Sequence, residues 1–297
     1  MKKRQALSSL YLLIASTIWG VAFVAQSEVV GLIGAYTFNC VRSFIGCIVL
    51  LPVIAIFGKK PSDDRTQRHT DNKRLLIYGT VCGTLLMIAA NLQQVAIDNG
   101  ATTGKAGFIT ACYIIFVPII GLFMKRHCSP FIWFAVALAT CGLYLLCMTD
   151  SFGFEKSDIL LLACAVAFSL QIIAIDKFLP HVDCVKLACV QFFVCGLLSG
   201  IMMFIFEQPT FAGIIAAWKP ILYTGALSSG VAYTLQIVGQ KELSPTVASL
   251  IMSLESAIAA ISGWLILGEM MSQRQILGCV IMFVAIILAQ LPAKKAA

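Results

Sequence analysis

A carboxyl group lies near the middle of a long apolar stretch of this chain, at Glu255 within residues 245–267. If that stretch crosses a lipid bilayer, the acid costs on the order of 3 kcal/mol unless it faces a cavity or a partner. Such a group could bind the ammonium group of a solute. It could also take up a proton, because low-dielectric surroundings favour the neutral form of a carboxyl group. A structural carboxyl group, hydrogen-bonded to neighbouring helices, is the alternative.

Tyr113 lies 142 residues before Glu255, at the position that an internal repeat described below makes equivalent. The ring of a tyrosine can stack on a solute, and its hydroxyl group can form a hydrogen bond with a carboxylate. We therefore predict that Tyr113 and Glu255 approach each other in one binding site. Simple packing of the tyrosine is the other interpretation.

Two amide side chains, Asn91 and Gln94, are three residues apart and therefore share one face of a helix. Tyr233 and Gln236 repeat this spacing later in the chain. Amide groups in hydrocarbon need hydrogen-bond partners, so they should face the protein interior. We predict that these four residues line the binding site. Gln94 and Gln236 would act either as a symmetric pair of gates or as ordinary links between helices.

Two cations, Arg42 and Lys105, fall within apolar stretches, toward the ends that are predicted to face the outside. For Lys105, the alternatives are snorkelling to the lipid headgroups and a binding role at the mouth of a cavity. Arg42 could pair with a carboxylate of the solute. The favoured interpretation of Arg42 is a structural or gating role, in which it locks its helix to a neighbour.

Aromatic residues give the expected pocket its walls. Trp19 and Phe23 are one helical turn apart, and Gln171 lies in the corresponding region of the second half of the chain. Aromatic walls with a few placed polar groups are typical of small-molecule pockets, so all three are predicted to bind the solute. Pro118 interrupts the backbone hydrogen bonds of its helix and should bend it, which predicts a structural or gating role.

These residues require membrane-spanning helices to position them. Of the 297 residues, 60% are hydrophobic and 12% are charged, about half the charged share of an average globular protein. A helix that crosses a bilayer needs roughly 20 mostly apolar residues. Ten stretches qualify, and they predict an all-α polytopic membrane protein: 8–26, 34–57, 75–97, 103–124, 130–148, 158–178, 186–206, 219–240, 245–267 and 274–291.

The basic residues predict the orientation of these spans. With the N-terminus in the cytoplasm, sixteen Lys and Arg residues lie inside, and only Lys156, Lys219 and Arg274 lie outside. This is a strong positive-inside bias. It predicts cytoplasmic N- and C-termini in the cell (inner) membrane. The formal charge of +7 then reflects topology and gives no reason to expect binding to nucleic acid.

An internal repeat divides the chain into two halves, residues 1–148 and 149–297. A shift of 142 residues aligns spans three and four with spans eight and nine, and a shift of 149 aligns spans one and two with spans six and seven. Each half then holds five helices, so the second half enters the membrane in the opposite orientation. Inverted repeats of this kind are typical of secondary transporters. The first shift matches Gly83 with Gly225 and Gln94 with Gln236, and the second places Trp19 on Phe168 and Arg42 on Gln191.

Several motifs resemble those of the EamA family of the drug/metabolite transporter superfamily. They are the run from Gly100 to Thr110 with Val117–Pro118, Ser253–Leu–Glu255 with the run from Gly263 to Glu269, Trp19–Gly20 with Phe23, and Arg42. The resemblance covers about residues 8–290 and includes the repeat. It implies a ten-helix carrier of metabolites, often amino acids or related compounds, frequently moved outward. Ser256 stands where many members have proline, which leaves open whether the helix is interrupted there.

Together these features predict a secondary-active transporter that moves small, amino-acid-like or related polar solutes by alternating access, in the export direction. An uncoupled facilitator of such solutes is the first alternative, and a membrane-embedded enzyme or receptor is the second. No catalytic residue, metal site or cofactor is expected, because His69, His127 and His181 all lie in connections between spans. The expected partners are the solute, membrane lipid and, for a coupled carrier, protons; a homodimer is compatible with the sequence.

Overall fold

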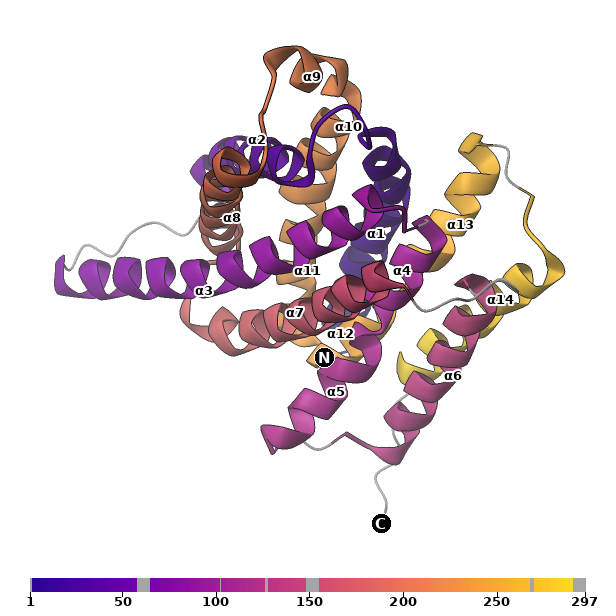
Figure 1. Ribbon diagram of the computed structural model, residues 1–297. Coiled ribbons are helices and arrows are strands. Elements are labelled where there is room, and N and C mark those ends of the chain that lie inside the picture. Colours follow the sequence, from indigo (N-terminus) through magenta and orange to yellow (C-terminus); the bar gives the residue numbers. More distant parts are fainter. Residues whose placement is uncertain are drawn as a thin grey trace.

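The computed structural model describes residues 2–57, 65–101, 103–125, 128–147, 155–267 and 270–290. Within these ranges every regular element is a helix (Figure 1). In the first half these are α1 (Lys2–Glu28), α2 (Ala35–Phe57), α3 (Arg65–Asp98), α4 (Thr103–Ala111), α5 (Tyr113–Phe123) and α6 (Pro130–Cys147).

The second half begins with α7 (Lys156–Phe178), the short 3-10 helix η1 (Leu179–His181) and α8 (Cys184–Phe206). Short helices then follow one another closely. They are α9 (Phe211–Ala216), α10 (Trp218–Leu222), the π-helix η2 (Tyr223–Ala232), α11 (Tyr233–Gly239) and the 3-10 helix η3 (Gln240–Glu242). The chain ends with α12 (Pro245–Met252), α13 (Leu254–Leu267) and α14 (Gln273–Gln290).

Polar residues at the ends of these apolar runs fix where the helices begin. The Asp183 side chain accepts hydrogen bonds from the backbone N–H groups of Val185 and Lys186 at the start of α8. Ser244 caps α12 in the same way, directly before Pro245 at its first turn. Unpaired N–H groups at a helix start are costly in a membrane protein, so these caps stabilise the turns between spans.

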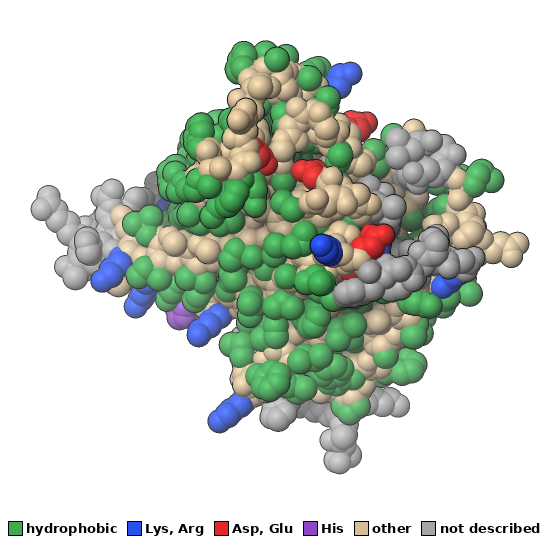
Figure 2. Space-filling view, in the orientation of Figure 1, with side chains coloured by type: hydrophobic (Ala, Val, Ile, Leu, Met, Phe, Trp, Pro, Cys, Tyr) green, Lys and Arg blue, Asp and Glu red, His purple; other side chains and the backbone are tan. Residues whose placement is uncertain are grey.

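Eight helical segments of the described residues are long and apolar enough to cross a membrane, rather than the ten that the sequence predicts. The predicted spans 130–148 and 274–291 correspond to the shorter apolar helices Pro130–Leu146 and Gln273–Ala289. Figure 2 shows hydrophobic side chains over most of the visible face, with few charged ones. Large apolar side chains such as Phe204 and Phe123 stay exposed, as expected for contact with lipid.

Several sequence-based assignments fall outside the described residues. They are the division between the halves at residues 148–149, Glu269 of the second EamA-like motif, His127, and the basic residues Lys59, Lys60, Arg126, Lys294 and Lys295.

Two of the predicted spans are interrupted at positions that differ by one residue in the repeat. Cys112 separates α4 from α5, and Ser253 separates α12 from α13. The second interruption therefore forms without a proline at Ser256. In span four the interruption lies at Cys112 rather than at Pro118, which sits inside the continuous helix α5.

The main contacts between the halves come in equivalent sets: where a helix of the first half packs on one of the second, their equivalents in the opposite halves also pack together (Figure 1). The most extensive pairs, α2 with α8 and α6 with α14, join equivalent spans. α3 packs against α7 and α8, and η2, the equivalent of α3, packs against α1 and α2. Likewise α4 and α5 contact α7, while α12 and α13 contact α1.

Glycines at equivalent positions make equivalent close contacts. A Cβ atom on Gly83 would lie 2.6 Å from the carbonyl oxygen of Gln191, and one on Gly225 would lie 3.1 Å from the carbonyl oxygen of Arg42. The sequence repeat aligns Gly83 with Gly225 and Arg42 with Gln191. Small residues let membrane helices approach closely, so both crossings depend on glycine.

A crossing with glycine on both helices joins α6 to α14. A Cβ on Gly278 would lie 2.6 Å from the carbonyl oxygen of Gly142, and a Cβ on Gly142 would lie 2.8 Å from that of Gly278. In both cases the obstacle is backbone, which cannot move aside as a side chain does. This pair of helices therefore needs glycine on both sides.

We expect Gly278→Ala to lower the free energy of unfolding by about 1–3 kcal/mol, the usual cost of overpacking. Thermal unfolding in detergent checks this. Gly107→Ala is the matched control, because the nearest atom to its new Cβ would lie at 3.7 Å and alanine favours the helix. Equal stability of the two variants would contradict the described crossing.

Candidate functional site

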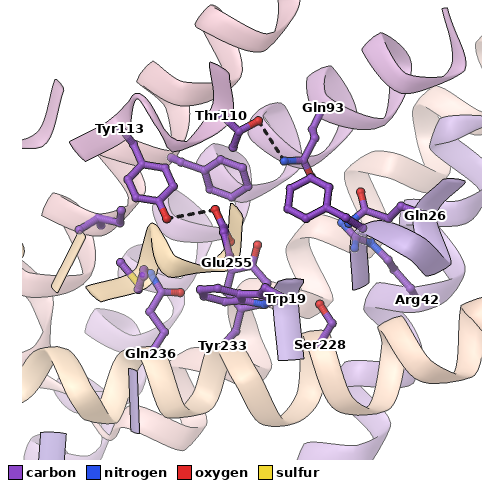
Figure 3. A pocket seen from close by; sticks show the side chains of 14 residues that line it. Trp19, Gln26, Arg42, Gln93, Thr110, Tyr113, Ser228, Tyr233, Gln236 and Glu255 are labelled. Atoms are coloured by element: carbon purple, nitrogen blue, oxygen red, sulfur yellow. Dashed lines mark hydrogen bonds between the residues drawn. The ribbon is translucent and has the colours of Figure 1, made fainter. Parts of the chain in front are cut away.

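A narrow cavity lies where the two halves meet (Figure 3). Its empty space, including the part open to solvent, is about 520 Å³, but the cavity volume left for water-sized molecules is only about 40 Å³. Its walls come from both halves and mix aromatic, amide and charged side chains. The lining residues are Trp19, Phe23, Gln26, Arg42, Gln93, Thr110, Tyr113, Phe168, Ile172, Ser228, Tyr233, Gln236, Met252 and Glu255.

Glu255 and Tyr113 meet in this cavity. The Tyr113 hydroxyl group donates a 3.0 Å hydrogen bond to Oε1 of Glu255, whose side chain is 7% exposed. Each residue lies just after the interruption of its span, so Glu255 falls in the first turn of α13. The start of a helix carries partial positive charge and stabilises a nearby carboxylate. The two interruptions thus place the acid and the phenol face to face.

Two aromatic rings, Trp19 and Tyr233, line the cavity beside the carboxylate (Figure 3). They make an edge contact with 4.7 Å between ring centroids, and Phe192, outside the lining, makes an edge contact with Tyr233 at 5.2 Å. The Trp19 Nε1 atom is buried and has no hydrogen-bond partner within the described part of the protein. A buried indole N–H group usually finds a partner, so it is available to a bound solute.

Arg42 lines the cavity at the end away from Tyr113, next to Gln26 (Figure 3). Its Nε atom donates a 2.7 Å hydrogen bond to Oδ1 of Asn39, one helical turn earlier on α2. The guanidinium carbon also lies 5.0 Å from the centroid of the Phe38 ring. Among the described residues, no carboxylate lies within ion-pair distance of Arg42.

An amide chain behind Arg42 connects three spans. Asn39 donates a 2.9 Å hydrogen bond to Oδ1 of Asn91 on α3, and Asn91 donates one of 2.9 Å to the hydroxyl group of Ser199 on α8. The predicted site residue Asn91 therefore does not line the cavity but supports Asn39 from behind. All members are buried, so the chain holds Arg42 in one orientation.

The glutamines occupy two different environments. Gln236 lines the cavity and donates a 3.3 Å hydrogen bond to Gln171, which in turn donates one of 3.4 Å to Gln191 behind it. Gln94 lies outside the cavity lining, where it donates to Asp98 and to the carbonyl oxygen of Gln26. Of the two predicted gates, only Gln236 reaches the cavity.

Lys105 and Pro118 are not among the residues that line the cavity. The Lys105 ammonium group lies 3.0 Å from Asp158 and 3.3 Å from Glu155, both near the start of α7. Lys105 therefore links α4 to α7. Pro118 is buried in α5.

The family model described as EamA-like transporter family matches this chain twice, over residues 6–148 and 155–291. The chain belongs to this family. Membership places it in the drug/metabolite transporter superfamily. Together with the apolar helices, it makes the protein a multi-pass membrane transporter.

Two relatives of this EamA-like transporter have names that state transport but no solute. An uncharacterized transporter of Archaeoglobus fulgidus is 28% identical over 290 residues, which cover 96% of this chain and 86% of the relative. The uncharacterized transporter YoaV of Bacillus subtilis is 22% identical over 270 residues, covering 89% and 90%. A solved crystal structure shares the fold, with a TM-score of 0.78 at 15% identity over 96% of both chains.

The cavity also contains residues that the sequence analysis of this EamA-like transporter did not single out. Three of them follow from applying the repeat to predicted residues or their neighbours: Phe168 is equivalent to Trp19, Ile172 to Phe23, and Met252 to Thr110. Gln26, Gln93 and Ser228 carry no comparable signal. Asn39 could have been found from its position three residues before Arg42 on the same helix face.

No group of three or more His, Cys, Asp or Glu side chains in the described ranges could hold a metal ion. The polar atoms that face the cavity are instead single hydroxyl, amide, indole and charged groups. This arrangement suits hydrogen bonding to an organic solute.

We expect Tyr113→Phe to lower the free energy of unfolding by about 1–3 kcal/mol at neutral pH, because the buried Glu255 carboxylate loses its hydrogen-bond donor. The loss should shrink in acid, where the carboxyl group is neutral. Thermal unfolding across a pH series measures both effects. Tyr144→Phe is the control, since that side chain is 49% exposed. A loss that does not change with pH would contradict this role for Tyr113.

Proposed function

We propose that this EamA-like transporter moves a small, partly polar solute across the inner membrane by alternating access, with the solute bound in the cavity between the halves. The observation that carries the proposal is the site itself. A buried carboxylate, an unpaired indole N–H group and aromatic rings from both halves converge on one cavity. Aromatic walls with a few oriented polar groups are the usual architecture of a small-molecule site.

The exchange of helix contacts between the halves supports a two-fold repeat of five spans each. In this view α6 and α14 are spans five and ten, which pack against each other at Gly142 and Gly278. Five spans per half would give the halves opposite orientations in the membrane. Two inverted halves can exchange conformations, which produces outward-open and inward-open states of similar energy.

The narrowness of the cavity supports a cycle with conformational change. A water molecule needs roughly 10–15 Å³ of such space, so the cavity as described holds only a few waters. A metabolite-sized solute would need the surrounding side chains or helices to move apart. Alternating access provides that movement, whereas a permanently open pore would require a continuous wide path.

The sequence and the family resemblance support the proposed topology and direction. The positive-inside bias supports cytoplasmic termini, and the resemblance favours export of the solute. A ligand carried by such a protein must bind both end states with comparable affinity, because strong preference for one state would trap it.

Glu255 is the candidate for proton coupling. In reconstituted vesicles, a pH gradient should drive accumulation of the solute, and Glu255→Gln should reduce gradient-driven accumulation to the level of passive exchange. The solute is first identified by competition among metabolites for protein-mediated flux. Glu242→Gln, which removes an exposed acid, is the matched control and should leave accumulation unchanged.

The other outcomes separate the alternatives. A flux that ignores the pH gradient in the wild-type protein would favour an uncoupled facilitator that uses the same cavity. Solute that is chemically altered without net movement across the vesicle membrane would instead show a membrane-embedded enzyme.

A further inference from the structure

We propose that Arg42 is the anchor for a carboxylate group of the transported solute, and that Asn39 is the positioning residue that aims it. This inference rests on the proposed function, since it assigns a chemical group to the solute of the same cavity. It replaces the interpretation of Arg42 as a lock between helices.

Arg42 carries a buried positive charge without a negative partner. Its side chain is 7% exposed, and its only close polar contact in the described part of the chain is the amide oxygen of Asn39. A cation within a membrane span is costly and normally pairs with an acid or faces a water-filled or ligand-filled space. Arg42 lines the cavity, so the cavity is the space that its charge faces.

The hydrogen bond of Arg42 argues against a lock. Asn39 lies on the same helix, so this bond does not join α2 to another span. A helix lock would be expected to reach an acceptor on a neighbouring helix. The links between helices are made instead by Asn39 and Asn91, which connect α2 to α3, and by Asn91 and Ser199, which connect α3 to α8.

The two terminal nitrogens of the Arg42 guanidinium group are left for a ligand. Asn39 occupies Nε, and the two terminal nitrogens have no hydrogen-bond partner among the described residues. A guanidinium group binds a planar carboxylate through two parallel hydrogen bonds. Because Asn39 is itself held by Asn91 and by the carbonyl oxygen of Ala90, the guanidinium group is oriented before a solute arrives.

The rest of the cavity favours a solute with both charges. Glu255 supplies one negative charge, Arg42 supplies one positive charge, and the aromatic residue Trp19 lies in the same cavity (Figure 3). A solute with one ammonium and one carboxylate group would neutralise both. A doubly charged phosphate group would leave excess negative charge near a single arginine.

Isothermal titration calorimetry of the protein in lipid nanodiscs tests the anchor with alanine, leucine and phenylalanine, each compared with its own amide. Each pair differs only in the carboxylate. In the wild-type protein, at least one acid should bind about tenfold or more tightly than its amide, as expected for loss of hydrogen bonds to a charged group. Arg42→Gln should abolish this preference while the amide still binds.

Asn39→Asp provides a second test that keeps the size and shape of the side chain. The new carboxylate would lie against the Arg42 guanidinium group and act as an internal counter-ion, so the preference for acids should also disappear. Arg74→Gln removes an exposed arginine outside the cavity and should keep the preference. Thermal unfolding accompanies each titration, and Arg42→Gln should not lower stability, because it removes an uncompensated buried charge.

The results separate this inference from the proposed function. Equal binding of acids and amides by the wild-type protein, or an acid preference that survives Arg42→Gln, would overturn the anchor. A wild-type protein that binds none of the six compounds but still carries another solute in vesicles would overturn the anchor and leave the carrier intact. Absence of flux for every solute tested, with the acid preference present, would instead contradict the proposed function.

Discussion

The high cost of an unpaired charge or polar group in hydrocarbon is the constraint on which the rest of this structure depends. It explains why Glu255 sits at a helix start beside Tyr113, and why the amides of Asn39 and Asn91 form a closed chain. Arg42, which has no acidic partner, and the indole of Trp19, which has no hydrogen-bond partner among the described residues, both face one cavity.

Close backbone contact is the second requirement, because helices in lipid gain little from hydrophobic burial against one another. Glycines meet this requirement at Gly142 and Gly278, and again where Gly83 approaches α8 and Gly225 approaches α2. The positions of Gly83 and Gly225 follow the sequence repeat. The same residues that allow tight packing thus record how one half is related to the other, and the cavity lies where the halves meet.

Sequence reasoning reached the helical fold, the family and the contact between Tyr113 and Glu255, because a buried acid and an internal repeat are strong local signals. It did not anticipate contacts that depend on three-dimensional neighbours. Asn91 was expected in the cavity but supports Asn39 from behind. For Lys105, the alternatives were a cavity mouth and snorkelling to the lipid headgroups, and its ammonium group pairs with Glu155 and Asp158, about fifty residues away in the chain. Spacing along one helix reveals which residues share a face, but not which helix that face meets.

The π-helix η2 sets a limit on the symmetry of the two halves. Residues 81–90, the equivalent stretch of α3, are wound as an α-helix, whereas Tyr223–Ala232 is wound more widely, with small residues at Gly225, Ser228 and Gly230. A π-helical turn holds an additional residue, so the two stretches cannot be superposed turn for turn. Ser228 and Tyr233 line the cavity, whereas their counterparts in α3, Leu86 and Asn91, do not. The two halves consequently line the cavity differently, so exchanging them would not reproduce the same site.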